Sequence, residues 1–307
     1  MSILAAFTRL PAPVRATLLM SAAMVFFTSM GIFIRLASEN LHVLEVVFFR
    51  NFLAVVLMAP WIMGYGISAL KTEKYGLYSL RAVINLVAMA AGFAAITMIP
   101  LAEATALGFT APLFATIGAV LVLGEVIRAR RVAALAAGFV GMLLVLRPGM
   151  EAMSLGALLA LGNAFGIAIT ALVVKKLTAT ERPEAIVLWM VLLQSPLSLV
   201  PALFVWTWPD PMTWVWLFCL AGAGTAGHVC WTRACGLAEI TQLQPLEFIK
   251  LPLIAVMGFL LFGEAPTVWV WLGGAVIFCS TAYISHREAV LARKRKRYPA
   301  NQLTKRD

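Results

Sequence analysis

Residues 101–114 read LAEATALGFTAPLF, and a changed copy of this stretch, LAEITQLQPLEFIKLPLI, occupies residues 237–254. Each copy is followed by an apolar run that ends in a Gly-Glu pair, at 124–125 in the first case and at 263–264 in the second. A Gly-Glu pair alone is a weak signal and is expected to serve turn chemistry at a loop edge. Its recurrence after both copies is a strong signal, so the chain is predicted to contain an internal repeat.

Segments on both sides of these copies extend the repeat. IFIRLAS at 32–38 matches ALVVKKLTA at 171–179, and GFVGMLLV at 138–145 matches GGAVIFCS at 273–280. The second member of each match follows the first at a nearly constant distance along the chain. The two halves of the chain therefore have the same order of segments.

The composition assigns the chain to the membrane. Of its 307 residues, 62% are hydrophobic and 12% are charged, and the mean hydropathy is +0.93. Soluble domains carry about 25% charged residues. A helix needs about 20 mainly apolar residues to cross a hydrocarbon layer about 30 Å thick, so this length accommodates about ten spans with short connections. The sequence predicts an integral membrane protein with little room for a soluble domain.

Ten apolar runs are candidate spans, and their length favours helices over the short alternating strands of a membrane barrel. They lie near residues 16–36, 44–63, 77–99, 102–123, 131–147, 153–174, 184–205, 212–234, 241–262 and 267–285. Consecutive copies of an odd number of spans must lie in the membrane with opposite orientation, as in many secondary transporters. We therefore expect an all-α integral membrane protein with ten transmembrane helices in two inverted five-helix repeats, over residues 16–147 and 153–286.

The distribution of lysine and arginine predicts the orientation. With the N-terminal segment 1–15 in the cytoplasm, that side also receives the basic tail at 287–307. Apart from those of the tail, the cytoplasmic side then receives these basic residues: Arg9, Arg15, Lys71, Lys74, Arg81, Arg128, Arg130, Arg131, Lys175, Lys176, Arg182 and Arg233. The positive-inside rule then places both termini in the cytoplasm. The tail is interpreted as an orientation signal that also contacts anionic lipid, and a nucleic-acid role is the weaker interpretation.

Ten spans, a five-plus-five repeat, proline in the fourth and ninth spans and a Gly-Glu pair after each are found together over residues 16–286. In these features the chain resembles the drug/metabolite transporter superfamily, EamA type. The resemblance implies a bacterial-type inner-membrane carrier that moves a small organic solute by alternating access. It also implies a central cavity lined mainly by the first, third, fourth, sixth, eighth and ninth spans. HVLEVVFFRNF at 42–52 and LR at 80–81 are similar to the branch that contains bacterial S-adenosylmethionine and riboflavin uptake carriers.

We expect a secondary-active transporter of an amino acid derivative, such as an S-adenosylmethionine-like solute. A riboflavin-type uptake carrier or a drug/metabolite exporter of the same fold is the alternative. The expected partners are this substrate, the lipid bilayer and a coupling proton or ion. An intramembrane enzyme or receptor is the alternative from another class, but Asp210 and Asp307, the only aspartates, cannot form a protease dyad in the membrane. The chain has no GxSxG, HExxH or GxxxxGK[ST] motif, so no catalytic residue, cofactor or metal site is predicted.

Glu247 and Lys250 are the leading substrate-binding candidates, because an ionisable group within a span is costly and is a functional hypothesis by default. Residues three apart share a helix face, so both side chains are expected on one side of the ninth span. Gln244 belongs to the same stretch and is a further candidate. The first repeat has no charge at this place, which favours a functional role. The alternative is that the two charges neutralise each other against a neighbouring helix.

Four other polar residues are candidates for the substrate site. Arg50 and Asn51 lie inside the second span. Arg50 attracts an anionic substrate group, pairs with Glu103 or extends to the outer interface, and the sequence leaves these interpretations open. Asn163 lies deep in the sixth span, where its amide needs a polar partner. His228 either takes part in proton coupling or packs as a hydrogen-bonded histidine.

Overall fold

The computed structural model describes residues 10–65, 72–111, 113–115, 117–118, 129–146, 154–177, 181, 183–237, 246–247 and 249–297. Within these residues the regular structure is helical. The helices are α2 (Ala12–Ala37), α3 (Val43–Tyr65), α4 (Tyr75–Met98), α5 (Leu101–Gly108), α7 (Ala129–Leu146), α8 (Leu155–Leu177), α9 (Pro183–Leu203), α10 (Pro211–Leu237), α12 (Lys250–Phe262) and α13 (Val268–Arg297).

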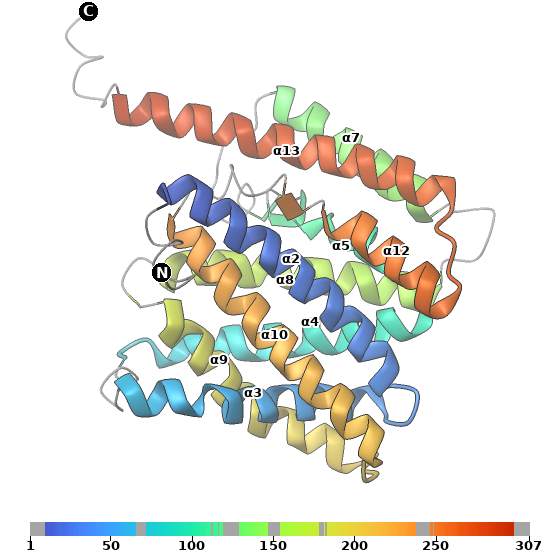
Figure 1. The fold of residues 1–307 in the computed structure, drawn as a ribbon. Helices are drawn as coiled ribbons and strands as arrows, with labels where there is room; N and C mark the ends of the chain where they lie inside the picture. The colour runs from blue at the N-terminus through green and yellow to red at the C-terminus, as the bar shows by residue number, and fades with distance from the viewer. Residues whose placement is uncertain are drawn as a thin grey trace, which may run out of the picture.

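Successive helices cross the molecule in alternating directions (Figure 1). α2 begins at Ala12 and α13 ends at Arg297 on one side of the bundle, which we call the terminal face. α2 ends at Ala37 and α13 begins at Val268 on the opposite side, which we call the far face. The N-terminal end of α2 and the C-terminal end of α13 therefore lie on the same face.

Six of the described helices have the lengths that the apolar runs predict. Six are long and apolar enough to cross a membrane: Val14–Ala37, Val43–Pro60, Tyr75–Met98, Leu155–Val174, Ala185–Leu203 and Pro211–Ala234. Shorter apolar stretches lie in α5, α7, α12 and α13, at the places of the fourth, fifth, ninth and tenth predicted spans. The prediction of an all-α membrane protein is confirmed. α13 continues to Arg297, so the first part of the basic tail extends the last helix.

Large apolar side chains cover the outside of the bundle. Val87, Val200, Leu260 and Val268 expose 65%, 60%, 69% and 69% of their surface. Soluble monomers rarely expose contiguous apolar patches of more than a few hundred Å². An apolar exterior around a helical bundle is the arrangement that a lipid environment requires, because lipid tails are themselves apolar.

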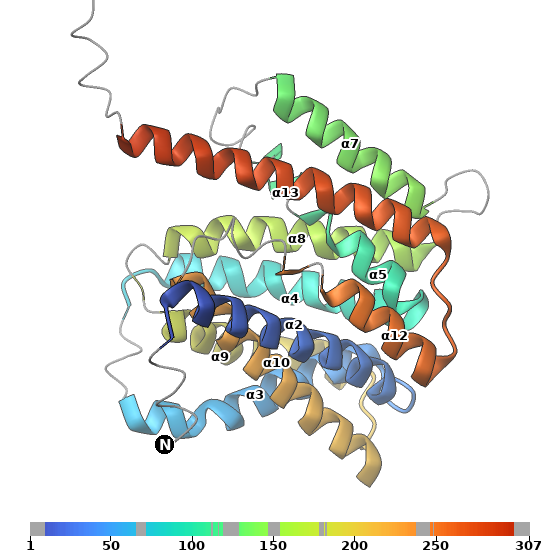
Figure 2. The same ribbon diagram turned by 45° about the horizontal axis from the view of Figure 1, so that its top comes forward.

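Each helix packs chiefly against a helix from the other half of the chain. The principal pairs are α2 with α10, α3 with α9, α4 with α8, α5 with α12, and α7 with α13. α7 and α13 lie along one edge of the bundle and α3 lies toward the opposite edge, in both directions of view (Figures 1 and 2). α4 and α8 lie between these two edges.

Small residues bring the backbones of two of these pairs close together. A Cβ at Gly273 of α13 would lie 2.5 Å from the carbonyl oxygen of Gly141 in α7. A Cβ at Gly166 of α8 would lie 2.5 Å from the Cβ of Ala88 in α4. A larger residue does not fit at such distances, and membrane helices commonly use small residues to approach each other.

The fourth element differs from the continuous helix predicted near 102–123, because α5 ends at Gly108. Of the ninth element, predicted near 241–262, the structure describes α12 from Lys250 onward and residues 246–247 and 249 before it. Proline explains the start of α12, because Pro252 is its third residue. The first turn of a helix has N–H groups without intrahelical partners, so a proline there removes no hydrogen bond. Deeper in a helix, the same residue would break the backbone ladder.

Candidate functional site

Glu247 and Lys250 lie at the start of α12, and Lys250 is its first residue. Glu247 is also helical, and the Ile249 N–H donates to the Leu246 carbonyl at 3.1 Å. Residues 238–245 and 248 lie outside the described residues, so the continuous helix that the sequence predicts through both side chains stays a prediction. Leu246, next to Glu247, packs against the same buried cluster as Trp231 of α10. The side chains of Glu247 and Lys250 are both partly accessible.

The position of Lys250 creates a demand for negative charge. The first-turn N–H groups of a helix have no intrahelical partners, and the N-terminal end of the helix dipole is positive. An ammonium group at this end is therefore unfavourable unless an anion lies close to it. Glu247 supplies one negative charge, and a ligand can supply another. Interrupted helices whose ends meet substrate near the midplane are a recurrent feature of membrane transporters.

Arg50 and Asn51 of α3 are buried in the bundle, with 2% and 0% of their surface exposed. Nη1 of Arg50 donates to Oδ1 of Asn51 at 3.0 Å. A Cβ at Gly224 of α10 would lie 3.3 Å from both Nε and Nη2 of Arg50, so the guanidinium packs against that glycine. This burial excludes the interpretation in which Arg50 extends to the outer interface. Nε of Arg50 and Nδ2 of Asn51 have no hydrogen-bond partner among the described residues.

His228 lies one helical turn after Gly224 on α10. Its ring contacts Phe27 of α2 edge-on, with 5.2 Å between the ring centroids. The Arg50 guanidinium packs against Gly224, one turn before His228 on the same helix. The His228 side chain is partly accessible. The structure therefore brings His228 and Arg50 together, as two of the predicted site residues.

Asn163 lies in the contact between α8 and α4. A Cβ at Gly92 of α4 would come within 2.7 Å of the Asn163 Cγ, so the amide occupies the space that the glycine leaves. The Asn163 side chain is partly accessible. Gln244 lies outside the described residues. The predicted site residues thus gather around α10 in one group and at the α4–α8 contact in another.

Arg81 is a buried residue that the sequence analysis used only as a cytoplasmic orientation signal and not as a site candidate. It lies within α4 and exposes 7% of its surface. Its Nη1 donates to the Ile186 carbonyl at 2.9 Å, and Nη2 lies 3.6 Å from Sδ of Met190, both in α9. Its Nε has no hydrogen-bond partner in the described part of the chain. The signal that could have found it is its place inside the apolar run predicted near 77–99.

Two neutral polar residues lie near Arg81. Nδ2 of Asn85, one turn further along α4, lies 3.6 Å from Sδ of Met190. Gln194 of α9 is fully buried and donates from Nε2 to the Ala82 carbonyl at 3.1 Å. Burial of amides in a bilayer requires such partners. The α4–α9 contact is therefore polar inside an otherwise apolar bundle.

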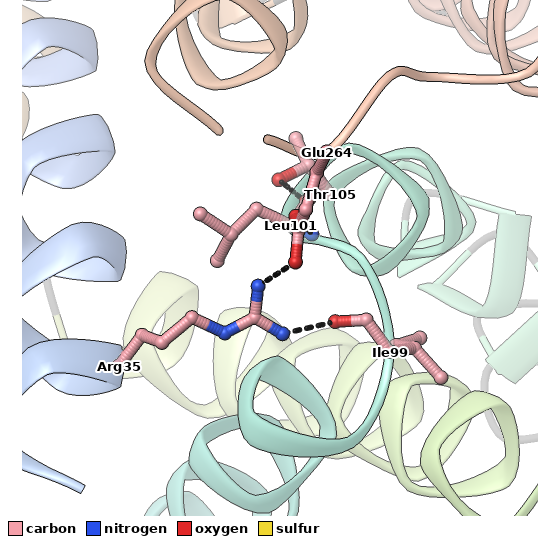
Figure 3. Close-up of polar contacts among 5 residues, drawn as sticks. All are labelled: Arg35, Ile99, Leu101, Thr105 and Glu264. Atoms are coloured by element: carbon pink, nitrogen blue, oxygen red, sulfur yellow. Dashed lines mark hydrogen bonds and ion pairs between the residues drawn. The ribbon is translucent and has the colours of Figure 1, made fainter. Parts of the chain in front are cut away.

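A second charged group joins three parts of the chain at the far face. Arg35, near the end of α2, forms an ion pair with Glu264 and donates from Nη2 to the Ile99 carbonyl at 2.9 Å (Figure 3). Oε2 of Glu264 accepts the Leu101 N–H at 2.9 Å. The guanidinium carbon also lies 5.3 Å from the ring centroid of Phe262. We call Arg35, Glu264 and the backbone groups of Ile99 and Leu101 the far-face network.

Gly263 brings Glu264 into this network. The glycine has φ 68° and ends α12, and its N–H donates to the Phe259 carbonyl at 3.0 Å. The Gly263–Phe259 bond is that of the αL type of helix end, and the Glu264 N–H donates to the Gly258 carbonyl at 3.2 Å. The positive φ requires glycine, so the expectation of turn chemistry for this Gly-Glu pair is confirmed for Gly263. It is incomplete for Glu264, whose side chain reaches across to α2.

A profile of the EamA-like transporter family matches the chain twice, over residues 14–147 and 154–286. The chain belongs to the EamA-like transporter family. The resemblance to the drug/metabolite transporter superfamily, EamA type, is thereby confirmed. The EamA-like protein is a multi-pass membrane transporter, which agrees with its six long apolar helices.

Several known proteins are similar to this EamA-like chain. A riboflavin transporter of Vibrio cholerae is 34% identical over 249 residues, covering 80% of this chain and 83% of the relative. An S-adenosylmethionine uptake transporter of Rickettsia prowazekii is 27% identical over 249 residues, covering 81% and 85%. One solved crystal structure matches with a TM-score of 0.63 and 17% identity, covering 89% of this chain and 98% of the other. The relatives agree on transport of a small molecule and differ in which one.

Proposed function

We propose that this protein is a secondary-active carrier that moves a small organic metabolite by alternating access between two inverted halves. The observation that carries the proposal is the exchange symmetry of the helix contacts. α2 packs on α10 as α8, its counterpart in the second half, packs on α4, the counterpart of α10. α3 packs on its own counterpart α9, as do α5 on α12 and α7 on α13. Two inverted halves around an axis in the membrane plane account for this pattern.

The same symmetry is visible in single residues. A Cβ at Gly166 of α8 would touch Ala88 of α4, and a Cβ at Gly224 of α10 would lie 3.2 Å from Sδ of Met30 in α2. Gly166 follows Met30 at the same distance along the chain as Gly224 follows Ala88. The two contacts therefore exchange with each other when the halves are exchanged, and this supports a repeat over 16–147 and 153–286.

The terminal face is proposed to be cytoplasmic and the far face periplasmic in a bacterial-type inner membrane. The basic residues Arg15, Lys74 and Arg233 lie in or beside helix ends at the terminal face. Positive residues in short connections favour the cytoplasmic side. Both termini, including the N-terminal segment 1–15 and the basic tail 287–307, are then cytoplasmic.

The substrate site is proposed to lie where α12 begins, with Glu247 and Lys250 as its charged pair. Asn163 and His228 contribute partly accessible polar groups from α8 and α10, and Arg50 with Asn51 contributes donors from α3. Partial access to Glu247 and Lys250 supports contact with a hydrated interior. A charge in lipid would be far more costly.

The far-face network is proposed to close the periplasmic end of the transport path in this conformation. Arg35 belongs to the first half, Glu264 to the second, and the Ile99 and Leu101 backbone groups lie between α4 and α5. Opening this end requires the halves to separate there, which breaks the ion pair. The Gly-Glu pair at 124–125 is the counterpart of Gly263 and Glu264 in the repeat, and it lies outside the described residues.

Two substrate classes are proposed, each on its own observation. A riboflavin-type vitamin is favoured by the 34% identity to a riboflavin transporter. An S-adenosylmethionine-type amino acid derivative is favoured by the acid-and-base pair, because Glu247 complements a cationic group and Lys250 an anionic one. The transport cycle uses a coupling proton or ion.

Uptake of radiolabelled riboflavin and S-adenosylmethionine into cells that express the protein tests the proposal. The wild-type protein is expected to accumulate one of them above the empty-vector level. Glu247→Gln and Lys250→Met should each abolish this transport and still give folded, membrane-inserted protein, because a wetted site tolerates loss of one charge. Glu39→Gln, a change of an exposed carboxyl at the far face, is the matched control and should leave transport intact.

The opposite result would identify a structural pair. Removal of one partner of a buried ion pair costs about 3–5 kcal/mol, and removal of both is close to neutral. If Glu247→Gln and Lys250→Met each misfold while the double variant is stable and transports, the charged pair is not the substrate site.

A further inference from the structure

Two buried arginines in the interior of the bundle have no acidic partner among the described residues. Arg50 and Arg81 expose 2% and 7% of their surface. Within the described residues, the ion pair of the bundle joins Arg35 to Glu264, and no described carboxylate contacts Arg50 or Arg81. Their partners are the Asn51 amide, one backbone carbonyl and the sulfur of Met190. An unpaired charge in a membrane interior is costly and points to a functional partner.

The free hydrogen-bonding capacity near these residues is mainly that of donors. Nε of Arg50, Nδ2 of Asn51 and Nε of Arg81 are buried and have no partner in the part of the chain that the structure describes. All three atoms carry N–H groups and accept nothing. Oε1 of Gln194 is a buried acceptor without a partner. A ligand that satisfies the three donors must offer oxygen or nitrogen lone pairs.

The two arginines come from different helices and lie near one packed cluster. Nη2 of Arg81 lies 3.6 Å from Sδ of Met190 in α9. Met190 belongs to the buried cluster that contains Ala54 of α3, one helical turn after Arg50. The donors thus border the same interior region, where α3 and α4 both pack against α9.

Charge decides the class of group that fits there. Electrostatic interactions gain strength as the surroundings exclude water, so two cations in the bundle interior attract an anion or a strongly polarised carbonyl. The same field repels a cationic group. Arginine also presents its N–H groups in a planar fork that matches a carboxylate or an imide edge.

We propose that Arg50, Asn51 and Arg81 form a donor subsite that binds the acceptor-rich end of the substrate. This inference rests on the proposed transport function and specifies the chemistry of one end of the substrate. For an amino acid derivative, the group is the α-carboxylate, and the cationic end lies toward Glu247. For a flavin-type vitamin, the group is the carbonyl edge of the ring system.

Equilibrium binding to the purified full-length protein in detergent micelles tests the subsite. The carboxylate arm compares S-adenosylmethionine with decarboxylated S-adenosylmethionine, which lacks only the carboxylate. The carbonyl arm measures riboflavin. Arg50→Gln and Arg81→Gln are each expected to weaken binding of the probe that the wild-type protein accepts about ten- to hundred-fold, as for loss of a charge-assisted hydrogen bond. Arg233→Gln, a change of an exposed arginine of α10, is the matched control and should bind like the wild type.

Lysine variants distinguish a bound carboxylate from a bound flavin carbonyl edge. They also keep the test valid if the glutamine variants fold poorly. Arg81→Lys retains the positive charge and loses the planar fork. It is expected to retain most of the binding of a carboxylate, because a point charge suffices, and to lose riboflavin binding as far as Arg81→Gln does. Decarboxylated S-adenosylmethionine should bind the wild type and Arg81→Gln with similar affinity in the carboxylate case.

Three outcomes would overturn the subsite. The first is equal wild-type affinity for S-adenosylmethionine and its decarboxylated form together with riboflavin binding that neither Arg50→Gln nor Arg81→Gln changes. The second is failure of the wild-type protein to bind any of the acceptor-bearing probes. The third is loss of binding in the Arg233→Gln control to the same extent. Transport that survives Glu247→Gln would instead refute the charged-pair site, whatever the arginine variants do.

Discussion

Replacement of Glu264 by glutamine should open the far face of this transporter. Arg35 and Glu264 expose 16% and 21% of their side chains, so their ion pair is mostly withdrawn from solvent. Glutamine keeps one amide oxygen and can serve either Arg35 or the Leu101 N–H, but it carries no charge. Loss of one charge-assisted interaction, typically 1.5–3 kcal/mol, gives an estimate of about 2 kcal/mol. That is about a 30-fold shift of the closed-to-open equilibrium, at about 1.4 kcal/mol for each factor of ten.

The labelling rate of a cysteine beside the network measures this shift. Thr105→Cys places a thiol in α5, one turn after Leu101, in a background whose four native cysteines are replaced by alanine. Its reaction with a membrane-impermeant maleimide on intact cells should be about 30-fold faster with Glu264→Gln, since the rate follows the open population. Glu39→Gln, at an exposed carboxyl on the same face, is the matched control and should not change the rate.

An exchange of the two charges sharpens the test. Arg35→Glu combined with Glu264→Arg restores the ion pair but presents a donor to the Leu101 N–H, which needs an acceptor. We expect fast labelling to persist in this variant. Slow labelling in the exchange variant would show that charge alone closes the face. An unchanged rate in Glu264→Gln would refute the reasoning, because the network would then be a static brace.

Three further predictions concern topology, packing and pH. Reporter fusions after Lys74 and after Asp210 should report cytoplasm and periplasm, respectively, and the reverse pattern would contradict the orientation. Gly273→Ala should lower the free energy of unfolding by about 1–3 kcal/mol, as for an overpacked contact, and should lower the melting temperature. The reason is that the new Cβ would lie 2.5 Å from a backbone oxygen. Gly222→Ala has no atom within 4 Å of the new Cβ, so equal losses in both variants would refute the packing argument. Hydrogen bonds from Thr213 lower the pKa of Asp210, which lies outside the spans, so this group stabilises the fold above its unfolded pKa of about 3.9 and loses that effect as the pH falls. Asp210→Asn should keep the α10 cap and show a smaller drop in melting temperature between pH 6 and pH 3 than the wild type.

The helical membrane fold could be predicted because its signals are local. Apolar runs of sufficient length have one structural solution in lipid, a helix that satisfies its own backbone groups. Interruptions were harder to place. Pro252 is visible in the sequence, but it is compatible with a bend inside a helix or with a helix start two residues earlier. In the structure α12 starts at Lys250, and residues 238–245 and 248 before it lie outside the described part of the chain.

The candidate site could be predicted only in part. A charged residue in an apolar run indicates a free-energy cost of burial, but it does not indicate which residue it contacts. Glu247, Lys250, Arg50 and His228 were recognisable as charged or titratable groups in apolar runs. Arg81 was not, since its place near the end of a span looks like that of a loop cation. Its burial against α9 depends on how α4 packs, which the sequence of α4 alone does not contain.

The sequence by itself determined that the chain crosses the membrane, where its apolar runs lie and that its two halves repeat, because hydrophobicity and duplication are properties of the linear chain. Only the tertiary structure decided which charges meet. Arg35 and Glu264 are 229 residues apart, and they come together because α2, the α4–α5 junction and the end of α12 converge at the far face. Contacts between residues so far apart in the sequence depend on how the helices pack at small residues, as at Gly141 and Gly273. No local sequence pattern encodes this packing.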